Sequence, residues 1–308
     1  MEYPLLEERE YDLSSRHVLV ARIVQAIAPP GPILDIGGSN GLTSLVLPER
    51  WVAAIDIRSA AVDVIGSGAQ LPFGDRTFAV AMALDVLEHV PDEVKESLVD
   101  EAARVADVVI FAGPYDDPEV RAAERHQRAL FQEMFARDHP WLAEHAASGL
   151  PSLEGTRRRL ESSGFETFAF GSNPLALWSV QLANTHIALR VGLDEKTLPV
   201  RRWLLREFLD RADATSPSYR HILTGARSKG LAPSVAQVVP DSDPDLVGDA
   251  IERTDLATGA VIAHAWDVTT EIRDDAVEQW RQTAETVRLL ERNALGAALL
   301  ERTVESRG

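Results

Sequence analysis

The sequence predicts an α/β protein built on a doubly wound, mainly parallel β-sheet, and three observations carry this prediction. Short apolar, often β-branched runs alternate with helix-compatible segments between residues 33 and 112. This alternation is the pattern of a parallel sheet that helices cover on both faces. The first run, residues 33–36, leads directly into a glycine-rich turn and a helix start, where unpaired backbone N–H groups can bind a ligand.

The elements follow one another in a regular order. Apolar residues at helical spacing from Val20 to Ile27 predict an opening helix, and the prolines at positions 29, 30 and 32 end it. The alternation that follows predicts strands over residues 33–36, 51–57, 77–84 and 107–112 and helices over 42–47 and 92–105, with a further short apolar run at 62–65.

Beyond Pro114 the alternation is interrupted twice. The pattern predicts helical insertions over residues 116–150 and 174–212. A strand is expected between them, over residues 165–170, and another after the second, over residues 219–224. We therefore expect one domain over residues 1–230. Residues 231–308 form an acidic C-terminal extension with a strand-like run at 234–239 and a long helix over 274–304. That helix is a candidate homodimer interface, although packing back on its own domain is an equal alternative.

Composition excludes several classes of function. The chain of 308 residues has 31 basic and 48 acidic side chains, a net charge of −17, which disfavours nucleic-acid binding. It has no cysteine, so disulfides, thiolate metal sites and cysteine nucleophiles are excluded and a cytoplasmic location fits best. The N-terminus lacks a secretory pattern, and the longest charge-free stretch, residues 167–189, is too polar to span a membrane.

The turn after the first strand is the most informative segment. The dinucleotide fingerprint requires glycine at the first, third and sixth loop positions. Those positions hold Gly37, Ser39 and Leu42, so a nicotinamide oxidoreductase is disfavoured. Asp35 beside the turn suits a cationic ligand, and Asp56 at the end of the next strand can accept hydrogen bonds from a ribose. The expected ligand carries a ribose and a positive charge.

Together with residues 66–78 and the segment Asp85 to Val90, this turn resembles the class I S-adenosylmethionine-dependent methyltransferases, in particular their small-molecule, type 11-like branch. The resemblance covers residues 18–112 and implies a Rossmann-like fold with seven strands. It also implies that S-adenosylmethionine is the cofactor and S-adenosylhomocysteine the product. In the chain Ser67 stands where many relatives place an acid that binds the adenine amino group.

The resemblance implies a cofactor site shared by several loops. Asp35, Gly37 and Gly41 would shape the methionine pocket, and Asp56 would hold the ribose. Ser67, Gly68 and Ala69 would border the adenine, and Asp85 would lie near the methionine. The complete expected set is Asp35, Gly37, Gly38, Gly41, Asp56, Ile57, Ser67, Gly68, Ala69, Gln70, Asp85 and Val86.

Histidines supply the candidates for catalysis. His126, His139 and His145 cluster in the first insertion, where a lid over the substrate is expected. His145 and His139 are the candidate general bases, and the expected substrate pocket comprises His89, His126 and Trp141. No metal site is expected, because the histidines lack a paired spacing such as His-x-x-x-His.

These features favour methylation of a small molecule or sugar, with oxygen as the acceptor atom. The block from His139 to Pro151 is similar to methyltransferases of bacterial surface-glycan and secondary-metabolite pathways. Methylation of nitrogen or carbon is an alternative. A protein of this fold that binds the cofactor or a partner without turnover is another, since fold alone does not settle activity.

Overall fold

A computed structural model describes residues 6–7, 9–27, 29–38, 41–57, 62–191, 197–268 and 278–285. Its centre is a seven-stranded sheet with the order β3-β2-β1-β4-β5-β7-β6. All neighbours pair in parallel except β7, which is antiparallel to both β5 and β6. The doubly wound, mainly parallel sheet of seven strands is thus confirmed. The strands are β1 (Ile33–Ile36), β2 (Val52–Asp56), β3 (Val64–Ile65), β4 (Phe78–Leu84), β5 (Ala106–Gly113), β6 (Glu166–Pro174) and β7 (Ser218–Ala226).

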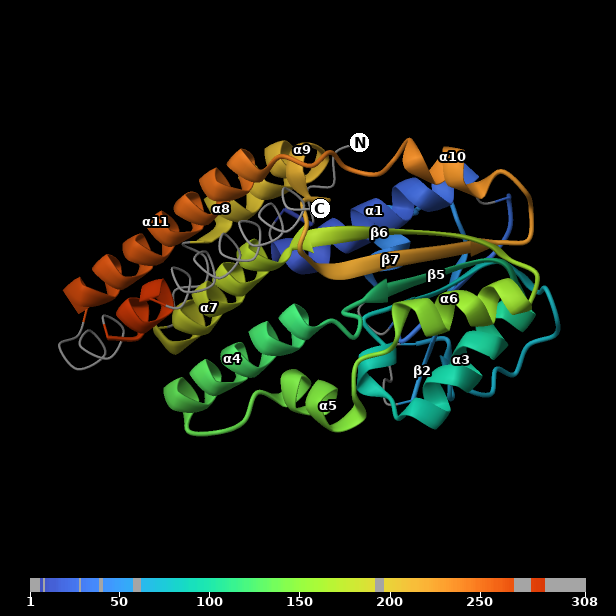
Figure 1. The fold of residues 1–308 in the computed structure, drawn as a ribbon, viewed down its shortest axis with the longest axis horizontal. Coiled ribbons are helices and arrows are strands. Elements are labelled where there is room, and N and C mark those ends of the chain that lie inside the picture. The colour runs from blue at the N-terminus through green and yellow to red at the C-terminus, as the bar shows by residue number, and fades with distance from the viewer. Residues whose placement is uncertain are drawn as a thin grey trace, which may run out of the picture.

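Helices cover both faces of the sheet because successive strand residues point to opposite sides. Along β4, Val80 and Met82 join the hydrophobic core under α1 (Tyr11–Ile27), whereas Ala81 and Ala83 join the core under α3 (Asp92–Val105) and α6 (Leu153–Ser162). Figure 1 shows α1 and α10 (Leu231–Ala236) on one side of the sheet and α3 and α6 on the other. The short α2 (Leu42–Val46) follows the glycine-rich turn.

A group of helices gathers at one end of the sheet, the end toward which β5 points (Figure 1). They come from the two expected insertions and from the C-terminal segment. The group comprises α4 (Pro118–Phe135), α5 (Pro140–Ser148), α7 (Leu175–Val191), α8 (Leu198–Trp203), the π-helical turn η3 (Leu204–Phe208), α9 (Leu209–Ala212) and α11 (Pro244–Val268). None of the helices in the described part of the chain is both long enough and apolar enough to cross a membrane.

The C-terminal segment differs from the expectation in two places. The expected strand at 234–239 is wrong, because α10 and a turn occupy these residues. The helix α11 was not expected, and it packs against α7, where Asn184 donates to the carbonyl of Thr254 at 3.1 Å. Leu246 and Ile251 belong to the same core as α1. Of the expected helix over 274–304, residues 278–285 are helical, and the rest, with its dimer surface, lies outside the described residues.

Candidate functional site

The sheet brings the expected cofactor residues together at the carboxyl ends of its central strands. Strand order reverses between β1 and β4, and ligands of open α/β sheets bind at such a switch point, beyond the carboxyl ends of the strands. The N–H of Gly37 donates to the carbonyl of Ile55 at 2.8 Å, and the N–H of Gly66 donates to that of Asp56 at 3.0 Å. The glycine turn, Asp56 and the turn after β3 therefore lie side by side.

Close packing explains the glycines of the first turn. Gly37 has a φ of 79°, and a β-carbon there would lie 2.6 Å from a methyl carbon of Val86. At Gly38 a β-carbon would lie 2.4 Å from the carboxyl carbon of Asp35. Gly41 has a φ of 68° and open space around its missing side chain. Gly37 and Gly38 have no room for a side chain, and the positive φ angles of Gly37 and Gly41 favour glycine.

Asp35 is a buried carboxyl group directly beneath this turn, with a side chain that is 3 % exposed. Burial raises the pKa of Asp35 to about 6, against the opposing effects of a hydrogen bond with Thr43 and the charge of Arg16. A positively charged ligand would favour the ionised form of such a group. The structure thus fits the cationic ligand that the sequence predicts.

The turn after β3 is arranged by its own hydrogen bonds. The Ser67 hydroxyl accepts from the N–H of Ala69 at 3.2 Å, and the N–H of Gln70 donates to the Ser67 carbonyl at 3.1 Å. A β-carbon at Gly68 would lie 2.7 Å from Ile36, so this turn packs on the end of β1. Ile57, which follows Asp56, is 58 % exposed. The adenine contacts of these residues stay a prediction.

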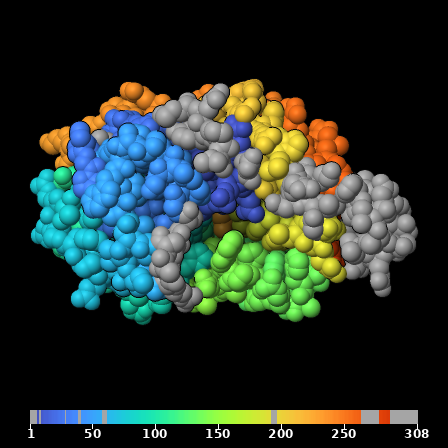
Figure 2. All heavy atoms as spheres, turned by 180° about the vertical axis from the view of Figure 1, so that it is seen from behind, coloured from blue at the N-terminus to red at the C-terminus, as the bar shows by residue number. Residues whose placement is uncertain are grey.

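A cavity of about 390 Å³ opens beside the glycine turn. Its wall includes Gly37 and Asp85 at the sheet edge, residues of α1 and α7, and three of the candidate side chains, His89, His139 and His145. Figure 2 shows the surface hollowed where the blue N-terminal, green and yellow parts of the chain meet. The volume is typical of pockets for small molecules.

Charged side chains lie on the wall of this cavity and directly behind it. Arg220 in β7 donates to Asp85 at 3.0 and 2.8 Å and to Asp12 of α1 at 2.8 and 3.2 Å. Arg16 also donates to Asp85, and its Nε has no partner among the described residues. The Asp85 carboxylate, expected near the methionine, therefore holds two arginines in place, and one of them, Arg16, lies on the cavity wall.

His89 and His145 meet on the same wall. The Nε2 atoms of the two rings lie 3.4 Å apart. The other ring nitrogen of each faces a carboxylate: Nδ1 of His145 lies 2.8 Å from Glu124, and Nδ1 of His89 lies 2.9 Å from Glu144. The Tyr219 hydroxyl donates to Glu124 at 3.0 Å and fixes it in turn.

Glu88 lies beside these rings, in the single turn η1 (Leu87–His89). Its side chain is 1 % exposed, and neither carboxyl oxygen has a hydrogen-bond partner within the described part of the chain. Burial raises the pKa of Glu88 to about 7. A buried carboxyl group without partners is costly and calls for a ligand.

The remaining candidates from the first insertion have different surroundings. His139 lies on the cavity wall, but its Nδ1 accepts from the N–H of Leu142 at 3.3 Å and so caps α5; burial lowers its pKa to about 4. Trp141 also borders the cavity and is 63 % exposed. The structure does not place His126 in the expected substrate pocket: its side chain is exposed and does not belong to the cavity wall. His126 follows Glu124 by two positions, which corresponds to a rotation of about 200° around the helix axis, so the two side chains point to opposite sides of α4.

Several residues of this site were not found from the sequence. Arg16, Arg220 and Gln181 stand alone in their segments, without a motif. Glu124 could have been noticed, because it and Gln127 interrupt the buried stripe that Val120 and Phe131 define on α4. A charged residue in the apolar face of an amphipathic helix needs a buried partner, which here is His145.

The chain was compared with known proteins. No family model and no curated protein matches. Among solved structures, a methyltransferase from Thermotoga maritima is 13 % identical, with a TM-score of 0.41, over 74 % of this chain and 100 % of that one. Magnesium protoporphyrin IX methyltransferase from Synechocystis with bound S-adenosylhomocysteine is 15 % identical, with a TM-score of 0.41, over 70 % of this chain and 83 % of that one. A mycolic acid cyclopropane synthase is 14 % identical, with a TM-score of 0.39, over 67 % and 82 %.

Proposed function

We propose that this chain is an S-adenosylmethionine-dependent methyltransferase that methylates a small molecule, with a hydroxyl oxygen as the acceptor. One observation carries the proposal. The glycine turn over Asp35 and the Asp56 carboxylate lie on neighbouring strands beside the switch point of the sheet, and the turn borders a cavity with charged and polar side chains on its wall.

The cofactor fits the chemistry of this edge. Asp56 would accept hydrogen bonds from the ribose hydroxyls, and the turn from Gly37 to Gly41 would contact the methionine part. Asp35 would supply negative charge beneath the turn. Arg16, whose Nε has no partner among the described residues, is a cation on the cavity wall that would suit the cofactor's carboxylate. When bound, the cofactor supplies a sulfonium methyl group that a nucleophile can attack.

The cavity supports a polar acceptor of small size. Both amide atoms of Gln181 are buried on its wall without hydrogen-bond partners in the described chain, as are both oxygens of Glu88. An acceptor with hydroxyl groups would satisfy such atoms, as a sugar or a hydroxylated metabolite does. The net charge of −17 argues against nucleic acid as the acceptor.

A hydroxyl acceptor must lose its proton as the new bond to carbon forms. His145 is the candidate to accept it, because Glu124 holds Nδ1 and leaves Nε2 on the cavity side. The enclosing helices α5 and α7 would exclude water and align the acceptor oxygen with the methyl group, and such alignment supplies several kcal/mol of rate enhancement. His139 is the weaker candidate, since its Nδ1 caps α5.

Calorimetric titration of the full chain tests the proposal. S-adenosylmethionine and S-adenosylhomocysteine should both bind, roughly in the micromolar range. Asp56→Ala should lower the affinity for both compounds at least about tenfold, a loss of about 1.4 kcal/mol of binding free energy. Asp249→Ala, which removes an exposed carboxylate of α11, should leave both affinities unchanged. Binding of neither compound, or binding of NADH in their place, would contradict the proposal.

A further inference from the structure

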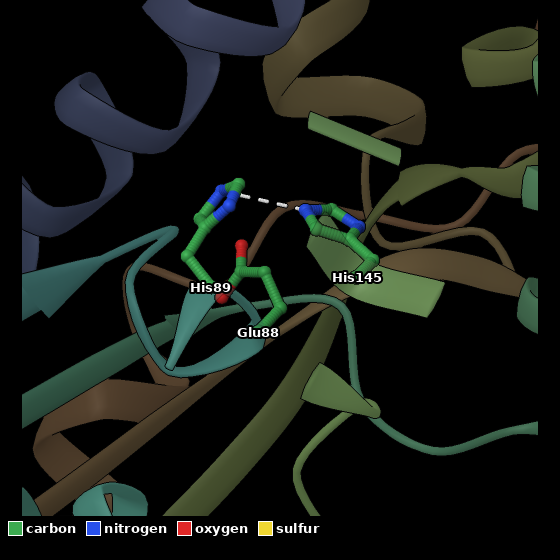
Figure 3. A group of neighbouring side chains, drawn as sticks. All are labelled: Glu88, His89 and His145. Atoms are coloured by element: carbon green, nitrogen blue, oxygen red, sulfur yellow. Dashed lines mark hydrogen bonds between the residues drawn. The ribbon is translucent and has the colours of Figure 1, made fainter. Parts of the chain in front are cut away.

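Three side chains on the cavity wall converge in a way that the methyl-transfer chemistry does not require. They are Glu88 and His89 of η1 and His145 of α5. Each offers one ligand atom, and these atoms all lie within 4.8 Å of one another. Figure 3 shows one carboxyl oxygen of Glu88 directed toward the gap between the two imidazole rings.

The carboxylates behind the histidines determine where the ring protons lie. A neutral imidazole carries a hydrogen on one nitrogen only. Glu124 and Glu144 accept hydrogen bonds, so the Nδ1 atoms of His145 and His89 are the protonated ones. The two Nε2 atoms then face each other across 3.4 Å, within hydrogen-bond distance (Figure 3). With both rings neutral two lone pairs would meet there, so the pair must hold either an extra proton or a metal cation.

The hydrogen bonds behind the two histidines match those that orient histidine ligands in metal sites. Histidine ligands of metals characteristically donate their other ring N–H to a carboxylate, which fixes the tautomer and the orientation of the ring. Both histidines of this cluster do so, and Tyr219 orients Glu124 in addition.

Glu88 supplies the negative charge that the cluster needs. It is almost completely buried, and its two oxygens have no hydrogen-bond donor among the described residues. A β-carbon at Gly113 would lie 3.0 Å from one of these oxygens, so the group is held against the end of β5. A bound cation would provide the partner that this buried carboxyl group lacks.

We propose that Glu88, His89 and His145 bind one divalent first-row transition-metal ion, with zinc as the representative. In tetrahedral zinc sites with bonds of about 2.1 Å, two ligand nitrogens lie about 3.4 Å apart. The separation of the two Nε2 atoms has this value. Two histidines and one carboxylate form a ligand set that leaves a further coordination position open. All three residues line the cavity, so that position would face it.

The sequence did not suggest this site because its histidines lie 56 positions apart, on separate elements. Metal binding itself does not depend on the reaction. For the proposed methyltransferase, and resting on that proposal, the ion would coordinate the acceptor hydroxyl and lower its pKa. Nε2 of His145 cannot bind a metal and accept a proton at once, so its two roles are alternatives that metal titration separates.

The experiment uses the full chain without an affinity tag, treated with a chelator and then titrated with Zn²⁺ against a chromophoric competitor. We expect one tightly bound equivalent. His145→Ala and His89→Ala should weaken Zn²⁺ binding at least about 100-fold, and the nearly isosteric Glu88→Gln at least about tenfold. Glu124→Gln, which leaves every ligand in place, should weaken it by about 10- to 100-fold.

His126→Ala is the matched control, because this histidine is exposed and lies outside the cavity wall. It should bind Zn²⁺ as the unchanged chain does. The metal proposal would be overturned if the unchanged chain had no stoichiometric Zn²⁺ site. It would also be overturned if all three ligand variants bound Zn²⁺ as tightly as the unchanged chain does. Binding of S-adenosylhomocysteine to the metal-free protein is measured in parallel, so that loss of the metal site and loss of the cofactor site are distinguished.

Discussion

Arg220 and Asp85 are joined by two hydrogen bonds of 3.0 and 2.8 Å beside the cavity, whose wall includes Asp85. Arg220 is completely buried in β7, and Asp85 follows β4 with a positive φ of 53°. The same guanidinium group binds Asp12 of α1. One side chain therefore fixes α1, which carries Arg16, relative to the sheet edge that carries the glycine turn.

Removing this arginine should destabilise the fold strongly. Arg220→Met would remove the buried guanidinium group that binds both Asp12 and Asp85 and would leave Asp85 with Arg16 alone; breaking a buried ion pair costs about 3–5 kcal/mol. Urea unfolding of both proteins measures the difference. Arg128→Met, which breaks an exposed pair with Asp138, should cost far less, because solvent screens such a pair. Equal losses in the two variants would contradict the assigned role of Arg220.

Gly38→Ala should weaken cofactor binding while the fold persists. The new methyl group would lie 2.4 Å from the Asp35 carboxyl carbon, so the turn must shift. We expect an affinity for S-adenosylhomocysteine at least about tenfold lower, a change of about 1.4 kcal/mol. Gly248→Ala in α11, where a β-carbon meets nothing within 4 Å, serves as the control. Unchanged affinity in Gly38→Ala would show that the ligand does not use this turn.

The affinity for S-adenosylmethionine should depend on pH through Asp35. Burial raises the pKa of this group to about 6, and a cation binds better to the ionised form. The affinity should therefore fall as the pH drops below about 6, by at most about tenfold per pH unit. In Asp35→Asn the affinity should be low and this dependence absent. A pH dependence that persists in Asp35→Asn would assign it to another group.

Loss of binding in acid would not reflect unfolding caused by Asp35. Its pKa is raised from 3.8 in the unfolded chain to about 6 in the folded protein, so the folded state holds the proton more tightly between these values. The contribution of this group to stability is therefore largest at low pH and decreases as the pH rises from about 4 to about 6. Thermal melts in the same buffers check this sign.

His139 should act on stability through its role as a helix cap. His139→Ala removes the acceptor for the Leu142 N–H and should lower the free energy of unfolding by about 1 kcal/mol. Asparagine is a good capping residue, so His139→Asn should recover most of this loss. If His139→Asn is stable but no longer methylates an acceptor, His139 is a base as well as a cap.

The sheet could be predicted because buried parallel strands leave a clear mark in the sequence. Residues 33–36, 78–84 and 106–113 are almost entirely apolar and precede turns or helices. The α11 helix escaped prediction because Gly248, Gly259 and two threonines weaken its helical character. The hydroxyls of Thr254 and Thr258 donate to carbonyls one turn earlier, at 2.8 and 2.9 Å, which satisfies them inside a buried helix.

The candidate site could be predicted only where its residues are close in sequence. Asp35, Gly37 and Gly38 form one turn, and register places Asp56 beside it. The ion network could not be anticipated, since Asp12 and Arg220 are 208 positions apart. For the same reason the carboxylate behind His145, Glu124 on another helix, was found only from the structure. Long-range pairs of this kind follow from packing, not from local pattern.

A crystal structure of the full chain with S-adenosylhomocysteine tests the central claim most directly. We expect the ribose hydroxyls on Asp56, the homocysteine along the turn from Gly37 to Gly41, and the sulfur atom facing the cavity that His89 and His145 border. Binding of the compound elsewhere, away from the carboxyl edge of β1 and β2, would contradict the assignment of the site and with it the proposed methyl transfer.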